Sequence, residues 1–330
     1  MTTPTQMPVD TPFTRLLGCP LPIQSAPMAG VVRDAALPAA VAAAGGHGMM
    51  PGAFLSAPYL ARVLDDLERS GTRAFGVNFV TLLLDPACLE VAASRAPLVD
   101  FFFGMPDPGL VARVHEAGAL ASWQVVSAEE ARAAQDAGCD LVVAQGVEAG
   151  GHPRGELGLL ALLDEVLGAV DVPVVAAGGI GGPRGVAAAL AAGAAGVRAG
   201  TRFIAAEESA AHRSYKEALV AARARDAVLT RRFCAGDPVE TTQRVLRSSL
   251  DAAERLDVET AGELVVGGMR LPAPRFGSLP PTEGSSGALD AMPLYAGQSV
   301  EGVRRVEPAG AIVAELARGA AVLAGGLVEA

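Results

Sequence analysis

Short runs of consecutive apolar residues alternate with alanine-rich segments over residues 22–203. Such runs are typical of strands buried on both faces, and the segments between them carry apolar positions at helical spacing. The alternation predicts β–α–β units and a parallel sheet. We expect eight strands, at residues 22–26, 48–50, 74–79, 98–103, 120–125, 141–144, 172–177 and 196–203. Helices are expected at residues 35–44, 58–69, 109–117, 128–137, 157–170 and 183–192.

An alanine–glycine pair recurs at the ends of the expected helices, just before a strand. The pairs are Ala44-Gly45, Ala117-Gly118, Ala137-Gly138 and Ala192-Gly193. Glycine stops a helix because it adopts the left-handed conformation without a steric penalty. Eight evenly spaced strands predict a (β/α)8 TIM barrel. An open doubly wound sheet would carry its dinucleotide fingerprint after the first strand, and this chain does not.

The pattern changes after the eighth strand. Residues 205–255 have a helical pattern with a break at 233–238, and residues 262–298 are rich in Gly, Pro and Ser. Residues 309–325 return to a helical pattern that would close the barrel. We therefore predict a barrel formed by residues 14–204 plus 305–330, with residues 205–304 forming a small helical insertion and a lid over the barrel mouth.

The composition excludes several classes of partner. The chain has 330 residues, of which 51% are hydrophobic, and a formal net charge of −10. This acidic balance argues against non-specific binding to nucleic acid or to an anionic membrane. Residues 1–13 lack the basic and apolar regions of a signal peptide, and the apolar runs are too short for a membrane span. We expect a soluble cytoplasmic protein, and the sequence leaves its oligomeric state open.

Candidate chemistry lies where the expected strands end, because TIM barrels build their active sites there. The strand ends carry residues 26–30, 78–79, 103–104, 124, 145–152, 178–179 and 200–201. This set is rich in glycine and side-chain amides and has no array of carboxylates, so it predicts neither a metal site nor a glycosidase pair. Asn78, Gln124 and Gln145 suit an amide-like ring edge, and the alternative is burial with backbone partners.

A phosphate site is expected after the last two strands. Residues 177–183 are glycine-rich and lead into a helix through Pro183, and Gly200 and Thr201 follow the eighth strand. A helix N-terminus presents N–H groups and the positive end of the helix dipole to an anion. The alternative is that these glycines only make tight turns.

His152 is the candidate base, since a glycine-rich turn delivers it from the sixth strand and imidazole transfers protons near neutral pH. The alternative is a loop histidine bonded to carbonyl groups. His47 is expected in a packing or surface role, and His115 and His212 are expected to be solvated on helices. Glu148 in the same turn is expected to brace the loop.

Several motifs together resemble a known family. They are QSAPMAG at 24–30, GVNF at 76–79, QGVEAGGH at 145–152, AAGGI at 176–180 and GTRF at 200–203. The combination resembles the nitronate monooxygenase family, formerly called 2-nitropropane dioxygenases. Further matches at 208–209, 244–247 and 295–298 extend the resemblance over nearly the whole chain.

The resemblance implies non-covalent FMN. The cofactor-binding residues that it implies are Ala26, Pro27, Met28, Asn78, Gln124, Gln145, Gly150, Gly151, Gly178, Gly179, Gly200 and Thr201. His152 matches the active-site histidine that takes a proton from a neutral nitroalkane. The implied reaction converts a nitronate and O2 to an aldehyde or ketone plus nitrite. Phe103, Tyr295 and Gln298 would form the substrate pocket.

Two departures from the family pattern lie near the substrate. Pro153 separates His152 from Arg154, and Phe102 stands in a segment where the best-characterised branch has a histidine. These departures bear on the substrate more than on the cofactor.

Three other functions stay open. One is an FMN-dependent enoyl-[acyl-carrier-protein] or quinone reductase that uses NAD(P)H. Another is a phosphosugar isomerase or aldolase, which should carry a strand-end lysine, whereas Lys216 is the only lysine and lies outside the strands. The third is a barrel that binds a phosphate ligand without redox activity.

Overall fold

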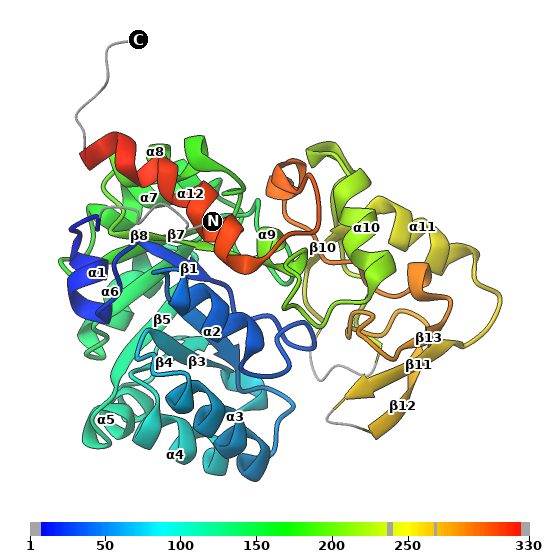
Figure 1. Ribbon diagram of the computed structural model, residues 1–330, viewed down its shortest axis with the longest axis horizontal. Coiled ribbons are helices and arrows are strands. Elements are labelled where there is room, and N and C mark those ends of the chain that lie inside the picture. Colours follow the sequence, from blue (N-terminus) through cyan, green and yellow to red (C-terminus); the bar gives the residue numbers. More distant parts are fainter. Residues whose placement is uncertain (1–7, 236–239, 267–268, 325–330) are drawn as a thin grey trace.

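Eight parallel strands form the core of the protein (Figure 1). The computed structural model describes residues 8–235, 240–266 and 269–324. The sheet has the order β1-β8-β7-β6-β5-β4-β3-β2. Its strands are β1 (Ile23–Ser25), β2 (Gly48–Pro51), β3 (Phe75–Val80), β4 (Leu98–Phe102), β5 (Leu120–Val125), β6 (Leu141–Gln145), β7 (Val174–Ala177) and β8 (Gly196–Ala199). This arrangement confirms the predicted TIM barrel.

The barrel closes between β1 and β2. Gln24 and His47 form a parallel β-bridge, with the His47 N–H donating to the Ile23 carbonyl at 2.8 Å. The Gln24 amide nitrogen also lies 3.1 Å from His47 Nδ1. His47 is completely buried and packs at this seam. Of the two roles expected for it, packing is therefore the correct one, and a surface position is not.

Helices surround the sheet. They are α2 (Ala36–Ala43), α3 (Ala57–Arg69), α4 (Pro86–Arg95), α5 (Pro108–Glu116), α6 (Ala128–Asp136), α7 (Leu159–Leu167), α8 (Pro183–Ala191) and α12 (Ala309–Ala324). The hydrophobic pattern did not predict α4 or α1 (Pro12–Leu17). Both begin with proline after a Thr or Asp cap, a signal that the hydrophobic pattern alone does not carry. No helix among the described residues is long and apolar enough to cross a membrane.

The alanine–glycine pairs end helices as predicted. Gly45, Gly118, Gly138 and Gly193 have φ values of 91°, 90°, 97° and 106°. After Gly118, for example, the Ala119 N–H donates to the Val114 carbonyl at 3.2 Å. This is the Schellman arrangement, which satisfies carbonyl groups in the last turn of a helix.

Two predictions around residue 200 need correction. The eighth strand was expected at 196–203, but β8 ends at Ala199 and the short helix α9 (Thr201–Ile204) follows. The insertion was expected to be helical over 205–255, yet among the described residues of this stretch only α10 (Arg213–Ala221) and α11 (Arg247–Arg255) are α-helical, along with the 3-10 turn η2 (Ala224–Asp226). Between them, β9 (Ala227–Thr230) and β10 (Gln243–Leu246) form an antiparallel pair. Their apolar and β-branched residues favour a strand once a partner is adjacent.

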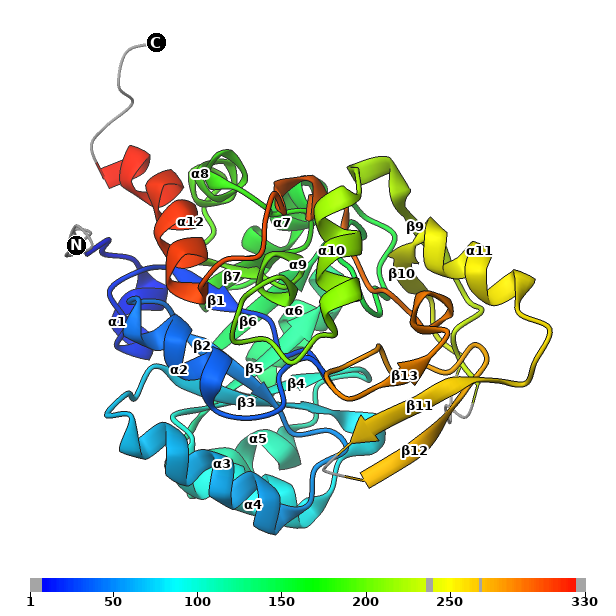
Figure 2. The same cartoon turned by 45° about the vertical axis from the view of Figure 1, so that its right-hand side comes forward.

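The Gly/Pro/Ser-rich segment also contains strands. β11 (Thr260–Val266), β12 (Met269–Pro274) and β13 (Ser286–Gly287) form a second small antiparallel sheet beside the barrel (Figure 2). Short 3-10 turns complete the described elements: η1 (Thr81–Leu83), η3 (Leu289–Ala291) and η4 (Gln298–Gly302). The domain boundaries at 204 and 305 stay a proposal. Residues 325–330 of that barrel segment, 236–238 of the expected break and 1–7 of the N-terminal segment lie outside the described residues.

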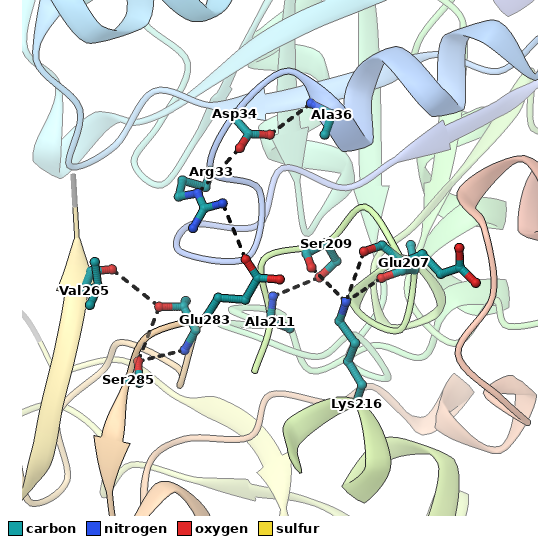
Figure 3. Close-up of polar contacts among 12 residues, drawn as sticks. Arg33, Asp34, Ala36, Glu207, Ser209, Ala211, Lys216, Val265, Glu283 and Ser285 are labelled. Carbon is teal, nitrogen blue, oxygen red and sulfur yellow. Dashed lines mark hydrogen bonds and ion pairs between the residues drawn. The ribbon is translucent and has the colours of Figure 1, made fainter. Parts of the chain in front are cut away.

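Lys216 fastens the insertion internally. It lies on α10, and its Nζ donates to the carbonyls of Ala206 and Ser209 at 2.7 and 2.8 Å (Figure 3). Burial lowers the pKa of this amine, and neighbouring glutamates oppose the shift. An ammonium held by backbone carbonyls away from every strand end is a structural group. It therefore lacks the position that an aldolase or isomerase lysine would need.

The barrel interior has an apolar end and a polar end. At the amino-terminal end, Phe13 of α1 is buried against Gly196, where an added Cβ would come within 2.8 Å of the ring. Farther along the strands, Arg198 of β8 forms an ion pair with Asp100 of β4, with Nη1 2.9 Å from Oδ2. Both side chains are almost completely buried. This pair forms the floor of any site that lies at the carboxyl ends of the strands.

Protonation of His47 should make stability depend on pH. Burial, assisted by the charge of Arg198, lowers the pKa of His47 from 6.5 to about 3. Because the folded-state pKa is depressed, the unfolded chain binds one more proton between these values. Stability is therefore full above pH 6.5 and falls as the pH decreases towards 3.

We expect the free energy of unfolding of the wild type to fall by about 2 kcal/mol more than that of His47→Gln between pH 7 and pH 5. Urea denaturation at each pH measures this difference. His115→Gln, which changes a half-exposed histidine, serves as the control. Parallel pH profiles for wild type and His47→Gln would contradict the assignment.

Candidate active site

A cavity of about 410 Å³ opens at the carboxyl ends of the barrel strands. All twelve residues proposed for the cofactor line it: Ala26, Pro27, Met28, Asn78, Gln124, Gln145, Gly150, Gly151, Gly178, Gly179, Gly200 and Thr201. His152, Phe103 and Tyr295 line it as well. The roles of these residues stay predictions. The placement of Gln298 in the pocket needs correction, because its side chain is exposed and does not line the cavity.

The insertion supplies one wall of this cavity. Ser278, Leu279, Pro280 and Tyr295 line it together with the barrel loops. All four lie in the segment that was expected to form the lid, and Ser278, Leu279 and Pro280 lie between β12 and β13. A barrel alone would therefore leave the site open on this side.

Polar side chains on the cavity floor are anchored by the Arg198–Asp100 pair. Asp100 also accepts hydrogen bonds from Asn78 Nδ2 at 2.7 Å and from Ser122 Oγ at 2.6 Å. Arg198 donates to Gln24 Oε1 at 2.7 Å and to Gln124 Oε1 at 3.1 Å. Among the described residues, Asn78 and Gln124 thus bond to charged side chains. These bonds fix the orientation of the amides beneath the cavity.

Two buried atoms on this floor have no protein partner. Gln145 Oε1 and Arg198 Nη2 make no hydrogen bond to any described residue, and both side chains line the cavity. A buried acceptor or donor left without a partner costs about 1–3 kcal/mol. A ligand with a polar, planar edge could satisfy both atoms, by donating a hydrogen bond to the Gln145 acceptor and accepting one from the charged Arg198 donor.

The loops after β7 and β8 are shaped by glycine. Gly178 and Gly179 have φ values of 99° and 70°, which other residues rarely adopt. A Cβ on Gly200 would point towards Ala26 and Met28, 3.4 Å and 3.7 Å from their nearest atoms. An added Cβ would lie 2.9 Å from the Gly146 carbonyl oxygen at Gly178 and 3.2 Å from the Glu148 Cβ at Gly179, so backbone conformation and packing both favour glycine there. All three glycines line the cavity, and their role in binding phosphate stays a prediction.

Arg202 holds these loops in place. Its Nη1 donates to the Gly181 carbonyl at 2.8 Å, and its Nη2 pairs with Glu307 at 3.0 Å and Glu315 at 2.6 Å. The side chain is buried, so it links the loop after β7 to α12 and to the segment before it. This role of Arg202 was not expected from the sequence, where the residue is only part of the GTRF motif at 200–203.

The turn that carries His152 is clamped by the insertion. The Arg244 N–H donates to the Gly151 carbonyl at 2.8 Å, and its guanidinium donates to the Val147 carbonyl, with Nη2 at 2.8 Å. The rings of His152 and Tyr295 lie with their centroids 5.2 Å apart. The Tyr295 hydroxyl donates to the Ser278 carbonyl at 2.6 Å. The candidate base is therefore positioned by residues far away in sequence.

Glu148 braces the same turn, as expected. Its carboxylate accepts the Leu159 N–H, with the two oxygens at 2.9 and 3.0 Å, at the start of α7. A Cβ on Gly146 would lie 2.7 Å from the Leu159 backbone nitrogen, so glycine is required there. Glu148 does not line the cavity and is a structural residue.

Arg198 is the main cavity residue that the sequence analysis missed. A charged residue inside the apolar run 196–199 was the available signal. A buried arginine needs a partner, and the partner, Asp100, likewise interrupts the apolar strand 98–103. Either residue alone suggests a surface position, whereas the pair indicates a polar barrel interior.

The chain is similar to a known family and to proteins of known name. The family model described as nitronate monooxygenase matches residues 84–319. A protein of Rhodococcus jostii named (3aS,4S,5R,7aS)-5-hydroxy-7a-methyl-1-oxo-octahydro-1H-indene-4-carboxyl-CoA dehydrogenase is 35% identical over 67% of this chain and 63% of its own length. The alignment therefore spans less than two thirds of that relative.

Two solved structures match nearly the whole chain. Nitroalkane oxidase from Streptomyces ansochromogenes is 33% identical, with a TM-score of 0.76, and the match covers 95% of this chain and 100% of that one. FabK from Thermotoga maritima is 30% identical, also with a TM-score of 0.76, and the match covers 96% and 98%. The barrel and the insertion are therefore both shared with these structures.

Gly150 should be intolerant of a side chain. An added Cβ would lie 2.5 Å from the Gly297 nitrogen and 2.7 Å from the Ala296 carbonyl carbon. We expect Gly150→Ala to lower the free energy of unfolding by about 1–3 kcal/mol, because the backbone of the insertion must move away. Urea denaturation of the ligand-free protein measures the loss.

The matched control is Gly185→Ala in α8, where the added Cβ meets only ordinary contacts, at 3.5 Å or more. This change should leave stability unaltered or raise it, because alanine favours a helix. Equal stability of the two variants would contradict the proposed clamp.

Proposed function

The chain belongs to the nitronate monooxygenase family, whose members are flavin-dependent oxidoreductases, and on this premise we propose that it binds FMN and oxidises alkyl nitronates. The proposed products, formed with O2, are a carbonyl compound and nitrite. The observation that carries the proposal is the pair of unpartnered atoms on the cavity floor, Gln145 Oε1 and Arg198 Nη2. An isoalloxazine ring has a polar edge with both N–H and carbonyl groups that would satisfy them.

The residues around the cavity fit the rest of FMN. The apolar backbone run of Ala26, Pro27 and Met28 would lie along the ring, and Asn78, Gln124, Gln145, Gly150 and Gly151 would surround it. The glycine turns at Gly178, Gly179 and Gly200, with Thr201 at the start of α9, would hold the phosphate. Thr201 Oγ1 already accepts the Gly297 N–H at 2.9 Å, so this wall is preorganised.

His152 is the proposed base. It would take the proton from the α-carbon of a neutral nitroalkane and so form the nitronate in place. Bound FMN would supply the electron-accepting chemistry. Phe103 and Tyr295 would flank the substrate, and the contact between the rings of Tyr295 and His152 would keep the imidazole directed into the cavity.

A flavin-dependent NAD(P)H reductase is the second candidate. The similarity to FabK, which covers 98% of that chain, favours it. A redox titration distinguishes the two. Under anaerobic conditions, propionate 3-nitronate should bleach the flavin of the purified protein within the mixing time, and NADH or NADPH should not. Rapid bleaching by NAD(P)H with no response to the nitronate would reverse the assignment.

The neutral and anionic forms of one substrate test the role of His152. We expect His152→Asn to lower kcat/KM for a neutral nitroalkane by about 10²–10⁴-fold, because general base catalysis is lost. The preformed nitronate needs no deprotonation, so its kcat/KM should change far less. Steady-state oxygen consumption measures both.

His115→Asn is the matched control for this test. His115 bonds to Asp140 at 3.0 Å and does not line the cavity, so both rates should stay at the wild-type level. Equal losses for the neutral and anionic forms in His152→Asn would contradict a role as base.

A further inference from the structure

Exposed apolar side chains gather at one side of the cavity mouth. Phe54, Leu82 and Leu83 are 52%, 51% and 37% exposed, and all three line the cavity. They lie on the loops after β2 and β3, and Met105, on the loop after β4, is 54% exposed. Four of the nine exposed large hydrophobic residues in the described chain thus share one end of the barrel. We call Phe54, Leu82 and Leu83 the apolar shelf.

Backbone conformation gives a second, independent indication that this side of the cavity mouth is functional. Three residues other than glycine have a positive φ among those described, and two of them line the cavity: Phe54 (63°) of the apolar shelf and Phe103 (69°). Phenylalanine rarely adopts this conformation, and such strain persists where the surroundings enforce it, often at functional sites. Here the strained backbone directs two aromatic rings to the mouth of one cavity.

The wall behind the shelf is rigid. The Thr81 hydroxyl donates to the Phe103 carbonyl at 2.6 Å, which ties the loop after β3 to the loop after β4. Arg154 lies over the rings of Phe102 and Phe103, 5.4 and 5.6 Å from their centroids. Glu130 holds this guanidinium with both carboxylate oxygens, at 2.8 and 2.7 Å. The departures from the family pattern, Phe102 and the displaced Arg154, therefore build one aromatic wall.

We propose that the apolar shelf binds an extended alkyl group of the substrate, whose planar anionic head lies at His152. This inference rests on the proposed nitronate oxidation and names its substrate class: a nitronate with a long alkyl chain. Of the described residues that line the cavity, Arg198 alone is always charged, and it lies on the floor. The apolar side chains at the mouth can therefore contact an alkyl chain. The described lining residues at the mouth include no cationic side chain that could bind the phosphates of a coenzyme A thioester.

Straight-chain carboxylates test the shelf without turnover. They share the planar, two-oxygen anionic head of a nitronate and cannot be oxidised in the same way. Isothermal titration of the FMN-loaded protein with propanoate, hexanoate, octanoate and decanoate gives Kd for each. Full burial of one methylene strengthens binding about fourfold, so we expect about two- to fourfold tighter binding per added methylene on a half-exposed shelf.

A double variant locates the effect. In Leu82→Ser/Leu83→Ser, Kd should become nearly independent of chain length, while Leu160→Ser/Leu229→Ser should retain the wild-type dependence. Leu160 and Leu229 are 62% and 45% exposed and do not line the cavity. Phe54→Gly should weaken the dependence and leave thermal stability unchanged or higher, because glycine adopts this φ without strain.

The outcomes separate this inference from the proposed function. A wild-type Kd that does not change with chain length, or a dependence that survives in Leu82→Ser/Leu83→Ser, overturns the shelf even if nitronates are oxidised. Chain-length dependence at the shelf without oxidation of any nitronate overturns the proposed reaction and retains the apolar shelf. Tight binding of coenzyme A itself, with no effect of the alkyl chain, overturns the substrate class.

Discussion

The buried ion pair of Arg198 and Asp100 is the interaction on which the site depends. Breaking such a pair leaves a buried charge without compensation, at a cost of about 3–5 kcal/mol. Asp100 of β4 accepts hydrogen bonds from donors on β3, β5 and β8. These bonds connect β4 to its two neighbouring strands and, across the barrel interior, to β8. Above that level the interior ends and the cavity begins. The remaining N–H groups of Arg198 are thereby presented to whatever occupies the cavity.

The insertion completes what the barrel begins. Arg244 bonds to the backbone on both sides of Gly150, and the contact between Gly150 and Gly297 leaves no room for a side chain. The turn that carries His152 is therefore held between β6 and the segment before α12. Barrel and insertion share one cavity, and a change at their contact should alter the position of the base as well as stability.

The hydrophobic pattern predicted the barrel well, because each buried strand and each glycine-terminated helix can be recognised from residues that are adjacent in the sequence. The insertion was misread because strands such as β9 and β10 are only four residues long and are separated from their partner by twelve intervening residues. The cavity floor was incomplete for the same reason. Arg198 lies 98 residues from Asp100 and 174 from Gln24, and no periodicity connects positions so distant. Gln298 was misplaced because a motif match fixes its backbone but not the direction of its side chain.

We propose that a flavin satisfies the two atoms of the cavity floor, Gln145 Oε1 and Arg198 Nη2, that no described residue satisfies. Gln145→Met tests it most directly, because Gln145 Oε1 has no partner among the described residues. Ligand-free Gln145→Met should be at least as stable as the wild type, and it should bind FMN about 5- to 100-fold more weakly in a fluorescence titration, since a hydrogen bond to the ring is lost. Reduced stability of the ligand-free variant with unchanged FMN affinity would show that Gln145 has a structural role and does not bind the flavin.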